Sequence, residues 1–93
     1  VFGVQARFRR ESLELSGQSR RYVRISDEGN KTNFEFCPHC GVTVYYASEG
    51  SEDMVGIPVG VFADPLFPAP TISVYEERMH SWVMMPEGIE HLN

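Results

Sequence analysis

Long apolar runs, an N-terminal signal pattern and an excess of positive charge are all missing from this sequence. No apolar stretch approaches the roughly 20 residues that a membrane-spanning helix needs, and the first residues do not have the pattern of a secretory signal peptide. The net charge is −5 and the isoelectric point is about 5.0, which argues against general binding to a phosphate backbone. We therefore expect a soluble, cytoplasmic protein that binds neither membranes nor nucleic acids.

Sustained helical spacing, internal repeats and interdomain linkers are missing as well. The 93 residues are too few for two independent cores, so we expect one domain over residues 1–93. Short alternating or β-branched segments separated by turn residues are typical of an all-β, mainly antiparallel domain. The expected strands cover residues 1–8, 12–17, 21–26, 33–37, 42–46, 71–77 and part of 81–92. Residues 54–62 are expected to form a strand pair or one bulged strand, with Gly and Pro placing it near an edge or a bend.

Cysteine is scarce: the chain has two, Cys37 and Cys40, in the stretch FCPHCG. At the tip between two expected strands, cysteines with this spacing can direct both thiolates to one tetrahedral ion. Pro38 favours the turn, and Gly41 tolerates the positive φ that such a knuckle often requires. A redox pair normally opens a helix, whereas a strand-like GVTVYY follows here, and a structural disulfide is unusual in the cytoplasm. The pattern therefore favours a zinc site that includes Cys37 and Cys40.

A structural zinc ion takes four ligands, and this chain offers few candidates beyond the two cysteines. His39 lies between them, where its ring is expected to point to solvent, His80 precedes a tryptophan, and His91 lies near the chain end. A site of two cysteines and two of these histidines matches no standard finger spacing. The chain also begins at Val1, in what looks like the middle of a strand, rather than at Met. We expect two further cysteines from a segment upstream of Val1 or from a second copy of the chain.

Several other residues have both a structural and a functional interpretation, and the structural one is favoured for each. Asp64 precedes a proline in FADP and is expected to form a turn. Core packing is the expected role of Phe62 and Trp82. Glu76 and Glu77 are expected at a solvated strand end. Three arginines suit a solvated strand face better than a site for an anionic ligand: Arg20, Arg21 and Arg24.

Three segments together resemble one known family. They are YVRISDEGNKTNFEFCPHCGVTVYY, VGVFADPLFPAP and SVYEERMHSWV, which span about residues 22–83. The strand that ends in F-C-x-x-C-G, the proline-rich loop and the late H-x-W segment are, in combination, similar to the glutathione-dependent formaldehyde-activating enzyme (GFA) family, which includes centromere protein V-like proteins. The resemblance implies a β-tent fold, a largely antiparallel β structure with a zinc-holding knuckle.

Zinc binding in this family also involves cysteines that this sequence does not contain. Members that resemble this chain carry an N-terminal C-x-C pair and then a C-x-C-x-x-C cluster. The resemblance implies that Cys37 and Cys40 complete a structural four-cysteine zinc site with the first pair, and that the cluster holds a second, catalytic-type zinc. Neither N-terminal motif occurs in residues 1–93. We therefore expect a domain that lacks its N-terminal cysteine-rich segment, and we assign no catalytic residue within it.

The activity that the resemblance implies is carbon–sulfur lyase chemistry, in which the S-hydroxymethyl adduct of glutathione and formaldehyde is made or broken. Zinc would act there as a Lewis acid on the thiol or on the hydroxymethyl oxygen. Two functions remain open for this chain: a zinc-dependent lyase that acts on a small thiol adduct, or a non-catalytic binding or scaffold module whose fold is stabilised by a bound zinc ion. A homodimer in which two chains supply four thiolates is compatible with both.

Overall fold

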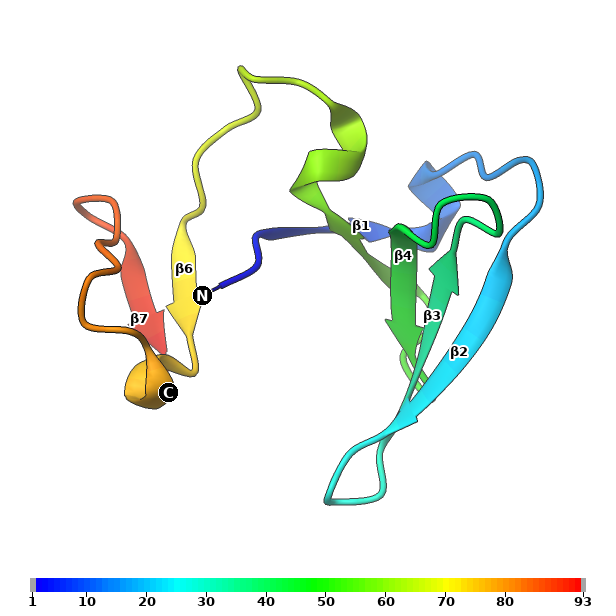
Figure 1. The fold of residues 1–93 in the computed structure, drawn as a ribbon, viewed down its shortest axis with the longest axis horizontal. Coiled ribbons are helices and arrows are strands. Elements are labelled where there is room, and N and C mark those ends of the chain that lie inside the picture. The colour runs from blue at the N-terminus through cyan, green and yellow to red at the C-terminus, as the bar shows by residue number, and fades with distance from the viewer. Residues whose placement is uncertain (1, 93) are drawn as a thin grey trace.

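The computed structural model describes residues 2–92, which contain seven β-strands and three short 3-10 helices. The strands are β1 (Gln5–Arg9), β2 (Arg20–Ile25), β3 (Lys31–Phe36), β4 (Thr43–Ser48), β5 (Met54–Pro58), β6 (Ile72–Val74) and β7 (Glu90–Leu92), and the 3-10 helices are η1 (Arg10–Ser12), η2 (Val59–Phe62) and η3 (Glu76–Arg78). None of these helices is long and apolar enough to cross a bilayer. The predicted all-β class is confirmed (Figure 1).

Five of the strands form one antiparallel sheet in the order β1-β5-β4-β3-β2. β2, β3 and β4 follow one another as hairpins, and β1 closes the opposite side by pairing with β5. The turn between β2 and β3 contains Asp, Gly and Asn residues: the Ser26 N–H donates to the Asn30 carbonyl at 2.8 Å, and Gly29 has a φ of 85°. β2 therefore lies at one edge of the sheet (Figure 1).

The apolar core lies against one face of β5. Val55 and Ile57 are 2% and 6% exposed, and both point to the same face because side chains alternate along a strand. Phe8 of β1 pairs with Val55 and meets the ring of Phe62 edge to face, with centroids 5.8 Å apart. Phe62 in turn stacks on Phe67 at 5.0 Å. η2 and the loop after it therefore place aromatic rings over this part of the sheet. Phe62 contacts Phe8 and Phe67 but remains 39% exposed, so it does not have the buried core position expected for it.

The opposite face carries a row of aromatic side chains across three strands. Tyr22 of β2 pairs with Phe34 of β3, and Phe34 pairs with Tyr46 of β4. The rings of Phe34 and Tyr46 have centroids 5.5 Å apart. The row ends at Gly56 of β5, where an added Cβ would overlap the Tyr46 ring. Glycine at this position lets the tyrosine lie over the backbone of the neighbouring strand.

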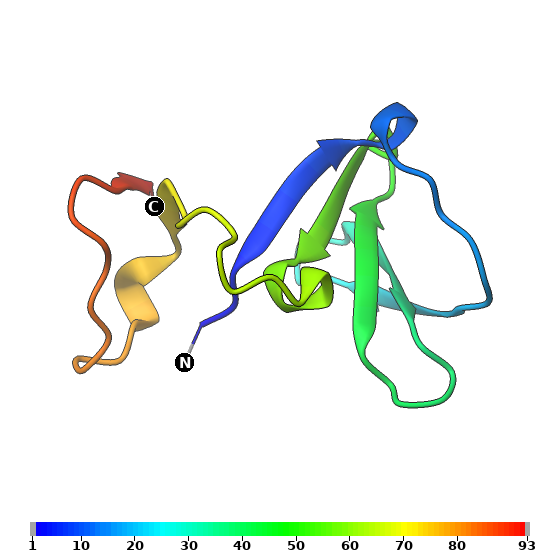
Figure 2. The ribbon, with the colours of Figure 1, turned by 90° about the horizontal axis from the view of Figure 1, so that it is seen from above.

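β6 and β7 form a separate two-stranded parallel sheet. Ser73 pairs with His91, and the Glu90 N–H donates to the Thr71 carbonyl at 2.9 Å. Val83 and Ile89 provide the buried apolar side chains of this segment. We call residues 71–92 the C-terminal unit; it lies beside the five-stranded sheet rather than on one of its faces (Figures 1 and 2).

The strand expected over residues 12–17 is wrong. The chain leaves β1 by forming η1, in which the Arg10 N–H donates to the Asp53 carbonyl at 2.7 Å and the Leu13 N–H to the Arg10 carbonyl at 3.1 Å. These two bonds turn the backbone away from the sheet. The alternating leucines of the segment, Leu13 and Leu15, are half-buried in the loop that follows.

Two other expected strands are shorter than predicted. The strand over residues 54–62 ends at Pro58 and continues as η2, in keeping with a residue that has no N–H for a sheet. The strand over residues 71–77 ends before Tyr75, which has a φ of 57°. This left-handed conformation is uncommon for a bulky residue, and the chain turns there into η3.

Candidate metal centre

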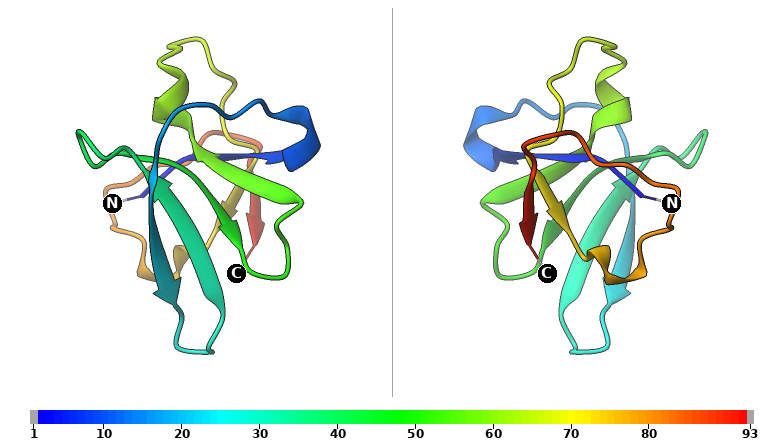
Figure 3. Two further views of the ribbon diagram at one scale, coloured as in Figure 1. Left: turned by 90° about the vertical axis from the view of Figure 1, so that its right-hand side faces the viewer. Right: turned by 90° about the vertical axis from the view of Figure 1, so that its left-hand side faces the viewer.

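Cys37 and Cys40 lie in the turn that joins β3 to β4. The Cys37 N–H donates to the Val42 carbonyl, and the Gly41 N–H donates to the Cys37 carbonyl, both at 2.8 Å. Gly41 has a φ of 80°, the conformation predicted for it. These bonds close a tight turn that projects beyond the ends of the neighbouring strands (Figure 3). We call residues 37–41 the knuckle.

Both thiols of the knuckle are free; Cys37 is half-buried and Cys40 is exposed. The pKa of the Cys37 thiol is lowered by the backbone N–H groups of Cys40 and His39 and by the Cys40 side chain, which outweigh the opposing effect of burial. The thiolate is the form of cysteine that binds metal, and hydrogen bonds from backbone N–H groups stabilise a ligating sulfur. The local geometry of the knuckle therefore suits a thiolate metal ligand.

The knuckle accounts for two of the four ligands of a tetrahedral zinc site. Within residues 2–92, no group of three or more histidine, cysteine, aspartate or glutamate side chains is placed to hold a metal ion. His39 is exposed in the knuckle itself, and the other two histidines lie in the C-terminal unit. Cys37 and Cys40 thus fit half of a zinc site, and the described part of the chain does not complete it.

His80 lies against Trp82 in the C-terminal unit. Their rings are stacked, with centroids 5.7 Å apart and planes 8° from parallel. Trp82 is 67% exposed, so the core-packing role expected for it is wrong. Its ring instead stacks on His80 at the surface.

His91 forms a polar cluster with Glu76 and Ser73. Its Nδ1 lies 2.7 Å from Glu76 Oε2, and hydrogen bonds from Ser73 and then from His91 lower the pKa of Glu76. Glu76 begins η3 and is half-buried, so it does not lie at the solvated strand end that the sequence predicted. The parallel pairing of β6 with β7 brings His91 opposite Ser73, and no local sequence signal indicates that pairing.

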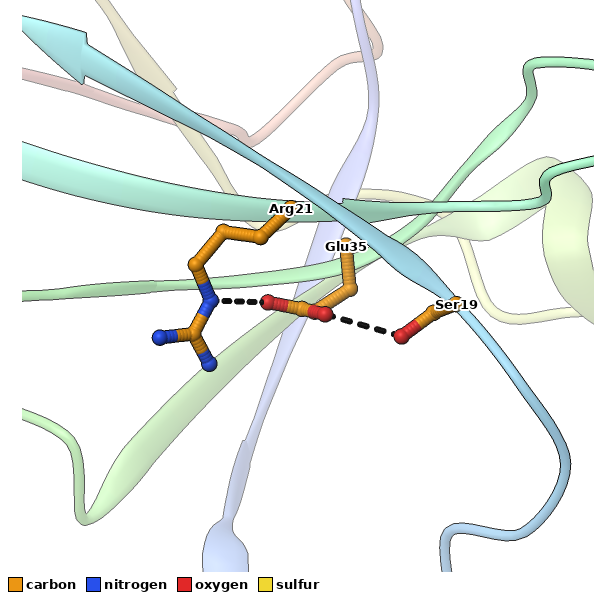
Figure 4. A network of polar contacts seen from close by, with 3 residues as sticks. All are labelled: Ser19, Arg21 and Glu35. Atoms are coloured by element: carbon orange, nitrogen blue, oxygen red, sulfur yellow. Dashed lines mark hydrogen bonds and ion pairs between the residues drawn. The ribbon is translucent and has the colours of Figure 1, made fainter.

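A second polar cluster joins β2 to β3 close to the knuckle (Figure 4). The buried carboxylate of Glu35 accepts a hydrogen bond from Arg21 Nε at 2.6 Å and another from Ser19 Oγ at 2.8 Å. Burial alone would raise the pKa of Glu35, but these two hydrogen bonds and the Arg21 charge together hold it below its usual value. The hydrogen bond to Glu35 and the negative charge of Glu35 in turn raise the pKa of Arg21. The sequence does not single out Glu35, because a polar residue between two phenylalanines in a strand normally faces solvent.

The remaining expected polar residues are divided between turns and the surface. Asp64 Oδ1 accepts the Leu66 N–H at 2.9 Å, which confirms its role in a turn. Arg21 is engaged by Glu35, whereas Arg20 and Arg24 are exposed and form no ion pair among residues 2–92. All three arginines are exposed, as expected for a solvated strand face, and Arg21 in addition binds Glu35.

Comparison with known proteins connects this geometry with a family. A family model described as glutathione-dependent formaldehyde-activating enzyme matches residues 1–78. The matched range contains the five-stranded sheet and the knuckle, and it ends before His80. No curated protein and no solved structure matches the chain.

Proposed function

Because the chain belongs to the glutathione-dependent formaldehyde-activating enzyme family, we propose that it is part of a zinc-dependent carbon–sulfur lyase that acts on a small thiol adduct, such as the S-hydroxymethyl adduct of glutathione. The observation that carries this proposal is the family match over residues 1–78. We place the activity in the cytoplasm, where free thiols such as those of Cys37 and Cys40 remain reduced.

Cys37 and Cys40 have a structural role in this proposal. They supply two thiolates to a zinc ion that fixes the β3–β4 turn, and the other two ligands come from outside residues 1–93 or from a second copy of the chain. Zinc in the family's second site would supply Lewis-acid polarisation of the reacting thiol or oxygen. Cys37 and Cys40 take no part in the lyase reaction. Their role is to fix the end of the sheet at which β3 turns into β4.

Metal binding by the knuckle is tested with the 93-residue chain and Co²⁺ as a spectroscopic substitute for Zn²⁺. We expect a thiolate-to-metal absorption band, lost in Cys37→Ser and in Cys40→Ser, together with association of two chains around one ion. The matched control is His39→Ala, which changes the residue between the cysteines and should retain the band. A band that survives in both serine variants, or one that depends on His39, would contradict the assigned ligands.

The lyase activity is tested with the natural polypeptide, including any residues that precede Val1. NMR exchange between glutathione, formaldehyde and their adduct measures the reaction, and elemental analysis measures the zinc content. We expect catalysed exchange and two zinc ions per polypeptide. One zinc ion and no catalysed exchange would instead establish the alternative, a zinc-stapled binding or scaffold module, which is favoured by one observation: both thiols of this chain lie in the knuckle.

A further inference from the structure

The outer edge of β2 has the properties of a binding surface. β2 is the last strand in the sheet and pairs with β3 alone among the described strands. All six of its residues, Arg20–Ile25, are exposed. An edge strand leaves every second N–H and C=O group along one side without a strand partner, and such an edge can pair with a further chain.

The side chains of β2 give this edge a positive charge on one face. Arg20, Tyr22 and Arg24 share that face because side chains alternate along a strand, and Tyr22 is 61% exposed. Their partners on β3 are an aromatic, an aromatic and a threonine, so no neighbouring carboxylate on β3 neutralises the two guanidinium groups. Arg21 points to the other face, where it is bound to Glu35. A protein of net charge −5 thus presents a local positive edge.

The same charges disfavour pairing of β2 with β2 of a second copy. In an antiparallel pair centred on Tyr22, Arg20 of each chain would lie opposite Arg24 of the other. Like charges directly opposite each other destabilise a strand pair. The charge pattern therefore selects a strand of opposite sign rather than another copy of this one.

We propose that β2 binds an acidic, extended segment of another protein, which adds to the sheet as a sixth strand. Backbone hydrogen bonds would supply affinity, and side chains at alternate positions would supply specificity. Arg20 and Arg24 lie about 13 Å apart along the strand, so the matching segment has acidic residues four positions apart with an apolar residue midway, opposite Tyr22. This pattern reads the same in both directions and suits parallel or antiparallel addition.

The proposal is tested with the 93-residue chain and a fluorescent peptide of sequence Ser-Glu-Val-Tyr-Val-Glu-Ser. Fluorescence polarisation measures binding, and amide hydrogen exchange locates it. We expect saturable binding that weakens with salt, together with slower exchange in residues 20–25. Two peptides and one nucleic acid serve as controls: a peptide with lysine in place of both glutamates, a peptide with backbone N-methylation, and a single-stranded oligonucleotide. We expect none of the three to bind comparably.

Matched variants of the protein distinguish charge-dependent binding from nonspecific binding. The double variant R20E/R24E should bind the glutamate peptide about tenfold more weakly and should bind the lysine peptide instead. Arg78→Glu changes an exposed arginine of η3 and should leave binding unchanged. Equal binding of the N-methylated peptide, tighter binding of the oligonucleotide, or protection of residues 20–25 by self-association without peptide would each overturn the proposal. The peptide controls decide the question even if the double variant fails to fold.

Discussion

The five-stranded sheet and the C-terminal unit each contain a serine, a glutamate and a basic residue joined by hydrogen bonds. In the sheet, Glu35 accepts bonds from Ser19 and Arg21. In the C-terminal unit, Glu76 forms hydrogen bonds with His91 and Ser73. The basic partners, Arg21 and His91, are similarly exposed at 61% and 55%, but the side chain of Glu35 is 9% exposed, whereas that of Glu76 is 21% exposed.

This difference in exposure determines how much each cluster contributes to the free energy of unfolding. A carboxylate that is removed from water depends on its partners, because any unsatisfied charge left in the interior is costly. A pair that is less deeply buried, such as Glu76 with His91, can replace part of its interaction with water, so its loss costs less. The sheet cluster should therefore contribute to global stability, and the C-terminal cluster should affect mainly its own unit.

The largest expected effect is that of Glu35→Ala. The change removes two hydrogen bonds to a buried carboxylate, and we expect the free energy of unfolding to fall by about 2 kcal/mol. Arg21 is 61% exposed and can be hydrated, which keeps the loss below that of a fully buried pair. Urea denaturation measures the change. Glu49→Ala, at an exposed glutamate, is the control and should alter stability by less than about 0.5 kcal/mol.

The pH dependence of the same cluster gives an independent check. The pKa of Glu35 is lowered in the folded protein, so its stabilisation is fully present above the unfolded value of about 4.3 and is lost as the pH falls through the folded pKa. The stability difference between the natural protein and Glu35→Gln should therefore shrink as the pH falls below about 4.3 and through the lowered pKa of Glu35 in the folded protein. A difference that stays constant over this range would show that the carboxylate charge has no role.

An intermediate effect is expected for Gly56→Ala, which tests how tightly the sheet is packed. The new Cβ would overlap the Tyr46 ring, and displacing that ring also disturbs its contact with Phe34. We expect a loss of about 1 kcal/mol, since the end of a tyrosine ring can move aside. Gly60→Ala is the matched control because nothing lies within 4 Å of its added Cβ. Equal losses in the two variants would rule out the ring overlap as the cause.

The sequence predicts most of the sheet but not the positions of its polar contacts. β2, β3 and β4 follow from alternating or β-branched segments bounded by clear turns, and the FCPHCG stretch correctly predicts the β3–β4 turn. The same alternation misplaces Glu35: it lies between Phe34 and Phe36, a pattern that normally marks a solvent-facing position. In the structure Phe34 and Phe36 are half-buried, and Glu35 is the buried residue of β3.

The C-terminal unit is predicted less well because its contacts are neither local nor repetitive. The pairing of β6 with β7 joins residues 18 positions apart, Ser73 and His91 among them, and short parallel strands carry no turn signal that would indicate the register. The left-handed conformation of Tyr75 also ends β6 without the glycine or asparagine that usually marks such a position. The sequence therefore predicts strand type here but not strand length or partner.

The smallest expected effect is that of His91→Ala, and it decides whether the C-terminal unit is energetically separate. The change removes the hydrogen bond to Glu76 from a residue whose side chain is 55% exposed, so the global urea transition should stay within error of the natural protein. Amide exchange within residues 71–92 should quicken about two- to fivefold, while exchange in β3 and β4 stays unchanged. His80→Ala, which disturbs the Trp82 stack instead, is the control for loss of a histidine in the same unit. If His91→Ala lowers global stability as much as Glu35→Ala does, the two clusters belong to one cooperative unit, and the contrast in exposure between them does not govern their contributions.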